Sequence, residues 1–185
     1  MLSKKELVKL YIDAIKLKHK EEPESMVFEF KYFEKIIEES NLTKDFIRNS
    51  ALHCISEPTQ EGDEDFIEAA LFLIEFLGEP SNWIDILNKL VIDKNHQRHE
   101  DIVHSLQHYK NPKSVQYLKG IIDLKEDLSY LDYDDYGAFY KQCFFALRDI
   151  GTKDAFLTIL GYFDSNNEIL REEANLFVKE FDIKL

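Results

Sequence analysis

Residues 67–78 read IEAALFLIEFLG, and the same pattern returns as HEDIVHSLQHYK at 99–110 and YKQCFFALRDIG at 140–151. Counted from zero, each copy has a small or apolar residue at +3, an apolar one at +7 and a large apolar or aromatic one at +10. A fourth copy runs from 171 to 181, and the four copies start 32, 41 and 31 residues apart. A period near 31 residues made of two helices is typical of an α-solenoid, in which each repeat buries its apolar face against its neighbours.

A second amphipathic helix is predicted after each of the first three copies. Apolar residues recur there at the i, i+3, i+4 and i+7 spacing of a helix with one buried face: Trp83, Ile86, Leu87, Leu90; Val115, Leu118, Ile121, Ile122; Phe156, Ile159, Leu160, Phe163. No run alternates convincingly with the period of two that a strand requires. We therefore expect an all-α solenoid of antiparallel helix pairs, with tight turns at Gly78, Pro112 and Gly151.

The 185 residues, 44% of them hydrophobic, can bury a full core as one continuous solenoid domain. Its N-terminal part, residues 1–63, is less regular, and its repeats occupy residues 64–185. The extra residues of the longest repeat form an insertion near 126–135, on the face where solenoids often bind partners. In the N-terminal part and the first repeat, helices are predicted at about 3–20, 25–40, 43–56 and 64–77.

Charge limits the classes of partner. The chain has 36 acidic and 23 basic residues and a net charge of −13. Nucleic-acid binders usually carry a basic surface, so we expect no nucleic-acid partner and favour a basic protein, although solubility alone also explains such a charge. The charged start of the chain is unlike a signal peptide, no stretch is long enough to span a membrane, and Cys54 and Cys143 fit buried free thiols; these features predict a cytoplasmic protein.

These features resemble HEAT-like repeats of the short bacterial type. Leu77-Gly78 and Ile150-Gly151 match the leucine-glycine helix end of the family, whereas the family's arginine survives only at Arg171. The resemblance covers residues 64–181 well and 1–63 only in a general way. It implies a right-handed α-solenoid and says little about activity, because one fold hosts many functions.

In that family the second helix of each pair lines the concave face, and positions +1, +5 and +9 point away from the core. The candidate partner-binding residues at +5 and +1 are Phe72, His104, Phe145, Glu68, Glu100 and Glu172. An aromatic row with an acidic border suits a protein-binding groove, since apolar anchors give affinity and charge gives orientation. The alternative is a helical phase shifted by one residue, which would place the rings in the core.

The insertion holds the most specific local feature, YLDYDDY at 130–136. Tyrosine offers a large contact area with little rotamer entropy to lose, and aspartate suits Lys or Arg on a partner. The candidate binding residues here are Tyr130, Asp132, Tyr133, Asp134, Asp135 and Tyr136. The alternative is a solvated connection whose tyrosines fold back on the solenoid.

Four polar residues spaced four apart, His96, Glu100, His104 and His108, would share one face of an early-starting helix and could hold a metal. Among HEAT-like proteins, the deoxyhypusine hydroxylases bind iron through His-Glu pairs on several helices. This chain has such a pair only once, at His99-Glu100. The chain also shows no glycine-rich phosphate loop and no nucleophile elbow. We therefore expect no metal, no cofactor and no enzymatic activity.

Size, charge and repeats make the chain similar to immunity proteins of bacterial contact-dependent or polymorphic toxin systems. That resemblance implies an acidic inhibitor that neutralises a basic toxin domain, such as a nuclease, encoded by a neighbouring gene. Two alternatives stay open: a scaffold or adaptor in another assembly, and a metal-dependent or lyase-type HEAT enzyme.

Overall fold

The computed structural model describes residues 1–22, 30–57, 60, 62–131 and 136–181. All regular structure in these ranges is helical, which confirms the all-α prediction. The chain divides into two compact units, an N-terminal unit of residues 1–81 and a C-terminal unit of residues 82–185. The boundary between the units lies just after the first repeated segment. The sequence analysis instead placed the boundary between the irregular N-terminal part and the repeats after residue 63. One continuous solenoid over both units stays a prediction.

The N-terminal unit contains four helices: α1 (Lys4–Glu21), α2 (Phe30–Ser40), α3 (Lys44–Ile55) and α4 (Glu64–Leu77). These bounds agree with the predicted helices to within a few residues, and the predicted start of the second helix lies outside the described residues. Helix α1 packs on the other three helices, and α3 also packs on α4. Two contacts order α1 along α4, because Lys4 pairs with Asp63 at 2.6 Å and Tyr11 donates to Glu68 at 2.9 Å. These two helices therefore run in the same direction.

Local hydrogen bonds define where these helices begin. At α1 the Ser3 and Glu6 side chains each accept from the other's backbone amide, at 3.4 and 2.8 Å, which is a capping box. At α3 the Thr43 hydroxyl accepts from the Phe46 amide at 3.2 Å. Helix α2 ends at Ser40, and the next residue, Asn41, adopts a left-handed conformation with φ 57°. Asparagine tolerates this conformation better than most residues, so the chain can turn sharply into α3.

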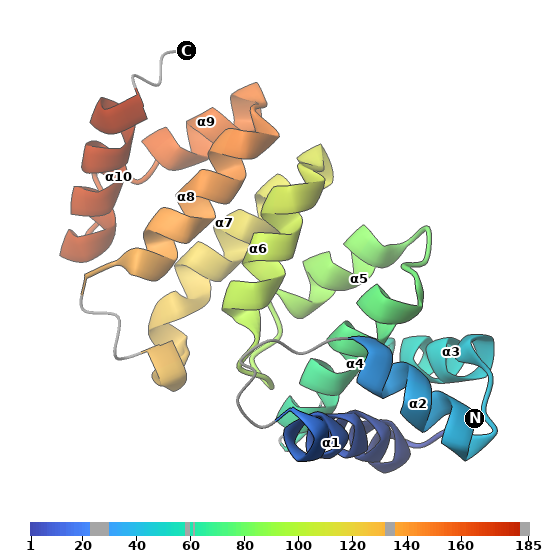
Figure 1. Ribbon diagram of the computed structural model, residues 1–185. Coiled ribbons are helices and arrows are strands. Elements are labelled where there is room, and N and C mark those ends of the chain that lie inside the picture. Colours follow the sequence, from blue (N-terminus) through green and yellow to red (C-terminus); the bar gives the residue numbers. More distant parts are fainter. Residues whose placement is uncertain (23–29, 58–59, 61, 132–135, 182–185) are drawn as a thin grey trace. The chain divides into compact units, whose positions relative to one another are not determined.

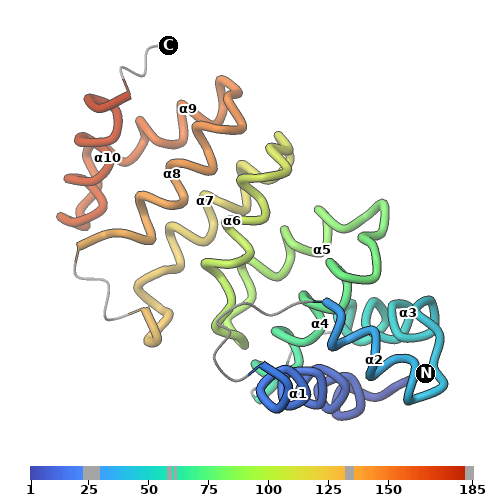
Figure 2. Tube along the Cα trace, viewed as in Figure 1, coloured from blue at the N-terminus to red at the C-terminus, as the bar shows by residue number. Residues whose placement is uncertain are grey.

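The C-terminal unit contains α5 (Trp83–Leu90), α6 (His99–Tyr109), α7 (Val115–Leu124), α8 (Ala138–Ile150), α9 (Lys153–Leu160) and α10 (Glu168–Phe181), together with short 3-10 turns. Helix α8 lies between α6 and α10 and packs on both, while α7 and α9 contact each other and also pack on α8 (Figure 2). The repeated segments at 99–110, 140–151 and 171–181 thus belong to adjacent helices.

Hydrogen bonds fix the register between α6 and α8. The Gln142 side chain donates to the Glu100 carbonyl at 3.0 Å, and the Gln107 side chain donates to the Asp149 carboxylate at 2.8 Å. Both pairs join residues 42 apart in sequence, one pair near the start of the helices and one near their end. The two helices are therefore parallel neighbours, as consecutive repeats require.

Glycines mark the ends of two repeated helices. Gly78 follows α4 with φ 100° and Gly151 follows α8 with φ 69°, as the predicted turns require. At the third turn, the left-handed residue is Lys110, and Asn111 caps the 3-10 turn that begins at Pro112. Gly137 also has φ 69°, and a Cβ there would lie 2.7 and 2.8 Å from side-chain atoms of α10. The start of α8 therefore lies so close to α10 that a larger residue at this position would clash.

Candidate functional site

Within the C-terminal unit, the +5 row consists of His104 on α6, Phe145 on α8 and Leu176 on α10. His104 is exposed, Phe145 is half-buried and Leu176 is 58% exposed. Because the helices are adjacent and α6 and α8 are in parallel register, these residues occupy equivalent places along one surface of the unit. We call the part of this surface formed by α8 and α10 the α8–α10 surface.

Phe145 belongs partly to the core and partly to this surface. Its ring meets the rings of Phe177 and Phe181 edge to face, with centroids 5.2 and 5.6 Å apart. The Arg148 guanidinium lies 4.9 Å from the Phe145 centroid and 4.5 Å from that of Phe181. Such ring pairs and cation–π contacts each contribute about 0.5–1.5 kcal/mol. The Phe145 ring therefore helps to hold α10 against α8, so the alternative of a core ring is partly correct.

A hollow of about 430 Å³ lies beside this ring cluster. Leu176 and Phe177 form its apolar part, and Lys141, Glu173, Lys179 and Glu180 provide charge around it. Lys141 pairs with Glu180 at 3.6 Å, and both side chains are more than 40% exposed. A surface ion pair of this kind contributes little to stability, so both groups can exchange partners at low cost.

Negative charge also borders the surface. Glu100 and Glu172 are exposed on α6 and α10. Asp149 on α8 is only half-buried; burial opposes ionisation, but hydrogen bonds from Gln107 and Arg148 hold the pKa of this carboxyl below its usual value. The carboxylate thus stays charged at neutral pH and orients the Arg148 side chain that covers Phe145.

Phe72 and Glu68, the candidates on α4, lie in the N-terminal unit. The half-buried Phe72 ring contacts Tyr11, Phe30 and Phe33, with centroids 5.2–5.8 Å apart. Glu68 is also half-buried and accepts the Tyr11 hydroxyl. Both residues thus serve the packing of their own unit. A row shared by Phe72 and Phe145 stays a prediction, because the two residues belong to separate units.

The insertion is described only at its two ends. Asp132, Tyr133, Asp134 and Asp135 lie outside the described residues. Tyr130 is half-buried and its hydroxyl lies 2.6 Å from His99 Nδ1, so this tyrosine folds back on the unit. Tyr136 is 87% exposed, so most of its surface is open to solvent. Of the described candidates in the insertion, Tyr136 alone is placed to contact a partner.

A pair of buried histidines, which the sequence reasoning missed, holds the segment before α6. The rings of His96 and His99 stack with centroids 4.2 Å apart. His96 Nδ1 accepts from the Arg98 amide at 3.0 Å, and its Nε2 donates to the Leu90 carbonyl at 2.8 Å. His99 Nε2 donates to the Asp93 carbonyl at 2.8 Å, which leaves Nδ1 to accept the Tyr130 hydroxyl. Both rings are therefore neutral and have a fixed tautomer.

This pair also explains why the four spaced polar residues do not form one face. Helix α6 begins at His99, so His96 lies before the helix and its ring binds backbone groups instead. Among the residues that the structure describes, no three or more His, Cys, Asp or Glu side chains are grouped so that they could hold a metal ion.

Burial, together with the neighbouring His96, lowers the pKa of His99 to about 4.

In the described ranges, no helix has both the length and the apolar character needed to cross a membrane. No protein-family model, curated protein or solved structure matches the chain. The function is therefore argued from the residues and surfaces above.

Proposed function

We propose that this chain is a non-enzymatic, HEAT-like protein-binding module whose α8–α10 surface binds a basic protein. The observation that carries this proposal is Leu176, a large apolar side chain that is 58% exposed on the same surface as the half-buried Phe145. An exposed leucine alone is ordinary, but here it adjoins a hollow, an aromatic cluster and exchangeable charges.

The physical roles of these groups differ. Covering Leu176 and the exposed edge of Phe145 would contribute on the order of 1–3 kcal/mol, since fully burying one such side chain contributes about that much. The net charge of −13 and the exposed Glu100 and Glu172 would attract a basic partner and speed its association. The exposed Tyr136 would add contact area, and the three aspartates of the insertion would pair with Lys or Arg of the partner.

We further propose that the partner is a basic toxin domain, such as a nuclease, encoded by a neighbouring gene, and that the chain neutralises it in the cytoplasm as an immunity protein. The acidic excess and the small size support this proposal, and so do the helical repeats. The continuous right-handed solenoid belongs to the same proposal, supported in the C-terminal unit by the parallel register of α6 and α8.

Co-expression with the product of the adjacent reading frame tests this function. The parent chain should protect the cells and form a stable complex with that protein. Leu176→Asp should weaken binding at least about tenfold, because it places a charge at the apolar contact. Leu157→Asp is the matched control, since Leu157 is 43% exposed on α9. Equal weakening by both variants, or by neither, would remove the α8–α10 surface from the account.

A further inference from the structure

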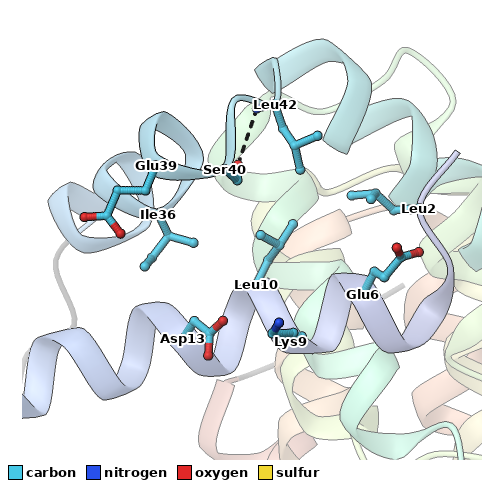
Figure 3. Close-up of a pocket in the computed structure, with 9 residues that line it drawn as sticks. All are labelled: Leu2, Glu6, Lys9, Leu10, Asp13, Ile36, Glu39, Ser40 and Leu42. Atoms are coloured by element: carbon cyan, nitrogen blue, oxygen red, sulfur yellow. Dashed lines mark hydrogen bonds between the residues drawn. The ribbon is translucent and has the colours of Figure 1, made fainter.

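The N-terminal unit has a hollow of its own between α1 and α2. Its volume is about 340 Å³. Figure 3 shows four apolar side chains converging on the hollow, with Leu10 of α1 lying between Ile36 of α2 and the pair Leu2 and Leu42. All four are half-buried, so the floor is apolar and still reachable from solvent. Glu6, Lys9, Asp13, Glu39 and Ser40 complete the lining.

The hollow is held in shape by hydrogen bonds between segments far apart in sequence. The Leu2 amide donates to the Ser50 hydroxyl of α3 at 3.0 Å, and the Cys54 thiol lies 3.6 Å from the Leu2 carbonyl. After α2, the left-handed Asn41 turns the chain so that Leu42 lines the hollow beside Leu2. Because three elements hold the site in shape, a ligand would lose little binding free energy in ordering it.

Two carboxylates of the lining have no ion-pair partner among the described residues, a property that they share with the exposed Glu38 and Asp65 outside the hollow. Glu21, Glu22 and Glu34 each pair with a lysine of a neighbouring segment at 2.6–2.8 Å. Asp13 and Glu39, by contrast, make no ion pair with any described residue. With Glu6 on the rim and Lys9 as the one basic lining residue, the lining is net negative.

We propose that this hollow binds a lysine or arginine side chain of a partner polypeptide, together with an adjacent apolar side chain. The aliphatic stem would lie on Leu10 and Ile36, and the cationic head would reach Asp13 and Glu39, as amphipathic basic side chains do on other surfaces. The volume is at the lower end for ligand sites, which suits one or two side chains rather than a whole helix. This site is independent of the function proposed for the α8–α10 surface, since every lining residue belongs to the N-terminal unit.

Amide chemical shifts of the full chain, followed by NMR during peptide titration, test the proposal. The probe is the blocked tetrapeptide acetyl-Leu-Arg-Arg-Leu-amide, and its counterpart with glutamates in place of arginines tests the charge. The arginine peptide should shift the amides of residues 9–13 and 36–42, and the glutamate peptide should not. Asp13→Asn combined with Glu39→Gln should weaken arginine-peptide binding by roughly fivefold or more, since each exposed pair contributes up to about 1 kcal/mol.

The matched control is Glu38→Gln combined with Asp65→Asn, which removes the same charge from exposed residues outside the hollow. This variant should bind the arginine peptide almost as the parent does. If both double variants lost the same affinity for the arginine peptide, net charge alone would explain the binding, and the proposed site would be wrong. Shifts centred elsewhere, an absence of shifts, or equal binding of both peptides would overturn it as well. The spectra also show directly whether each variant is folded.

Discussion

The buried histidine pair predicts a specific loss of stability in acid. Burial lowers the pKa of His99 from 6.5 to about 4 in the folded chain. As the pH falls below 6.5, the His99 ring therefore binds a proton in the unfolded chain but not in the folded chain. The free energy of unfolding declines until the pH reaches about 4. Above pH 6.5 the neutral ring keeps its full contribution.

The size of this loss follows from the pKa difference. Between pH 7.5 and 4.5 the free energy of unfolding should fall by between about 2 and 3 kcal/mol through this group, at about 1.4 kcal/mol per pKa unit. Urea unfolding followed by the fluorescence of Trp83 reports on the right part of the molecule, because Trp83 is the sole tryptophan and is buried in the C-terminal unit.

The variant His99→Gln isolates the effect. The glutamine side chain can still donate to the Asp93 carbonyl through its NH₂ group and accept from the Tyr130 hydroxyl through its carbonyl oxygen, but it does not titrate. The stability difference between parent and variant should therefore shrink by between about 2 and 3 kcal/mol as the pH falls from 7.5 to 4.5. His104→Gln, at an exposed site on the same helix, should keep the pH profile of the parent. Parallel profiles for the parent and His99→Gln would refute the role given to the buried pair.

Three further predictions concern the C-terminal unit, the thiols and the insertion. Gly151→Ala should cost roughly 1 kcal/mol for its left-handed backbone alone, and Gly137→Ala should cost more in urea unfolding because the added Cβ also meets α10; equal costs would contradict the close packing of α8 on α10. Cys54 and Cys143 should react slowly with a thiol reagent until urea is added, because both are buried and burial raises the pKa of each thiol; fast native labelling of both would contradict this. Changing the three aspartates of the insertion (Asp132, Asp134 and Asp135) to lysine should slow association with a basic partner, and added salt should reduce this effect. Unchanged association kinetics would mean that the insertion takes no part in binding.

Helix positions could be predicted from the sequence because periodic burial leaves a direct trace in it. The stripes Ile67 to Leu77 and Tyr140 to Ile150 end where α4 and α8 end, and they begin about three and two residues after the helices do. The repeated segment that starts at His99 also matches the start of α6, whereas the metal hypothesis required a helix that began early enough to include His96. Its ring instead binds the Leu90 carbonyl, and a side chain bound to the backbone leaves no periodic signal.

The candidate surface could be predicted only in part for the same reason. The partial exposure of Phe145 follows from its helical position and fits the half-buried ring. Its contacts with Phe177 and Phe181, and the Arg148 guanidinium over its face, depend on how α10 seats on α8. The hollow between α1 and α2 had no signal at all, since its floor combines residues from separate segments whose meeting depends on the tertiary fold.

The central claim is that the α8–α10 surface binds a basic protein. Site-specific photo-crosslinking in the cells that make the protein tests it most directly, with the crosslinking amino acid placed at Leu176 and, as a control, at Leu157 on α9. Both side chains are exposed, so both sites can react. The account predicts that the Leu176 site joins one basic polypeptide, that the product disappears in Glu100→Lys combined with Glu172→Lys, and that the Leu157 site does not capture it. Capture of the same polypeptide with equal yield from both sites, or of an acidic one from Leu176, would contradict it.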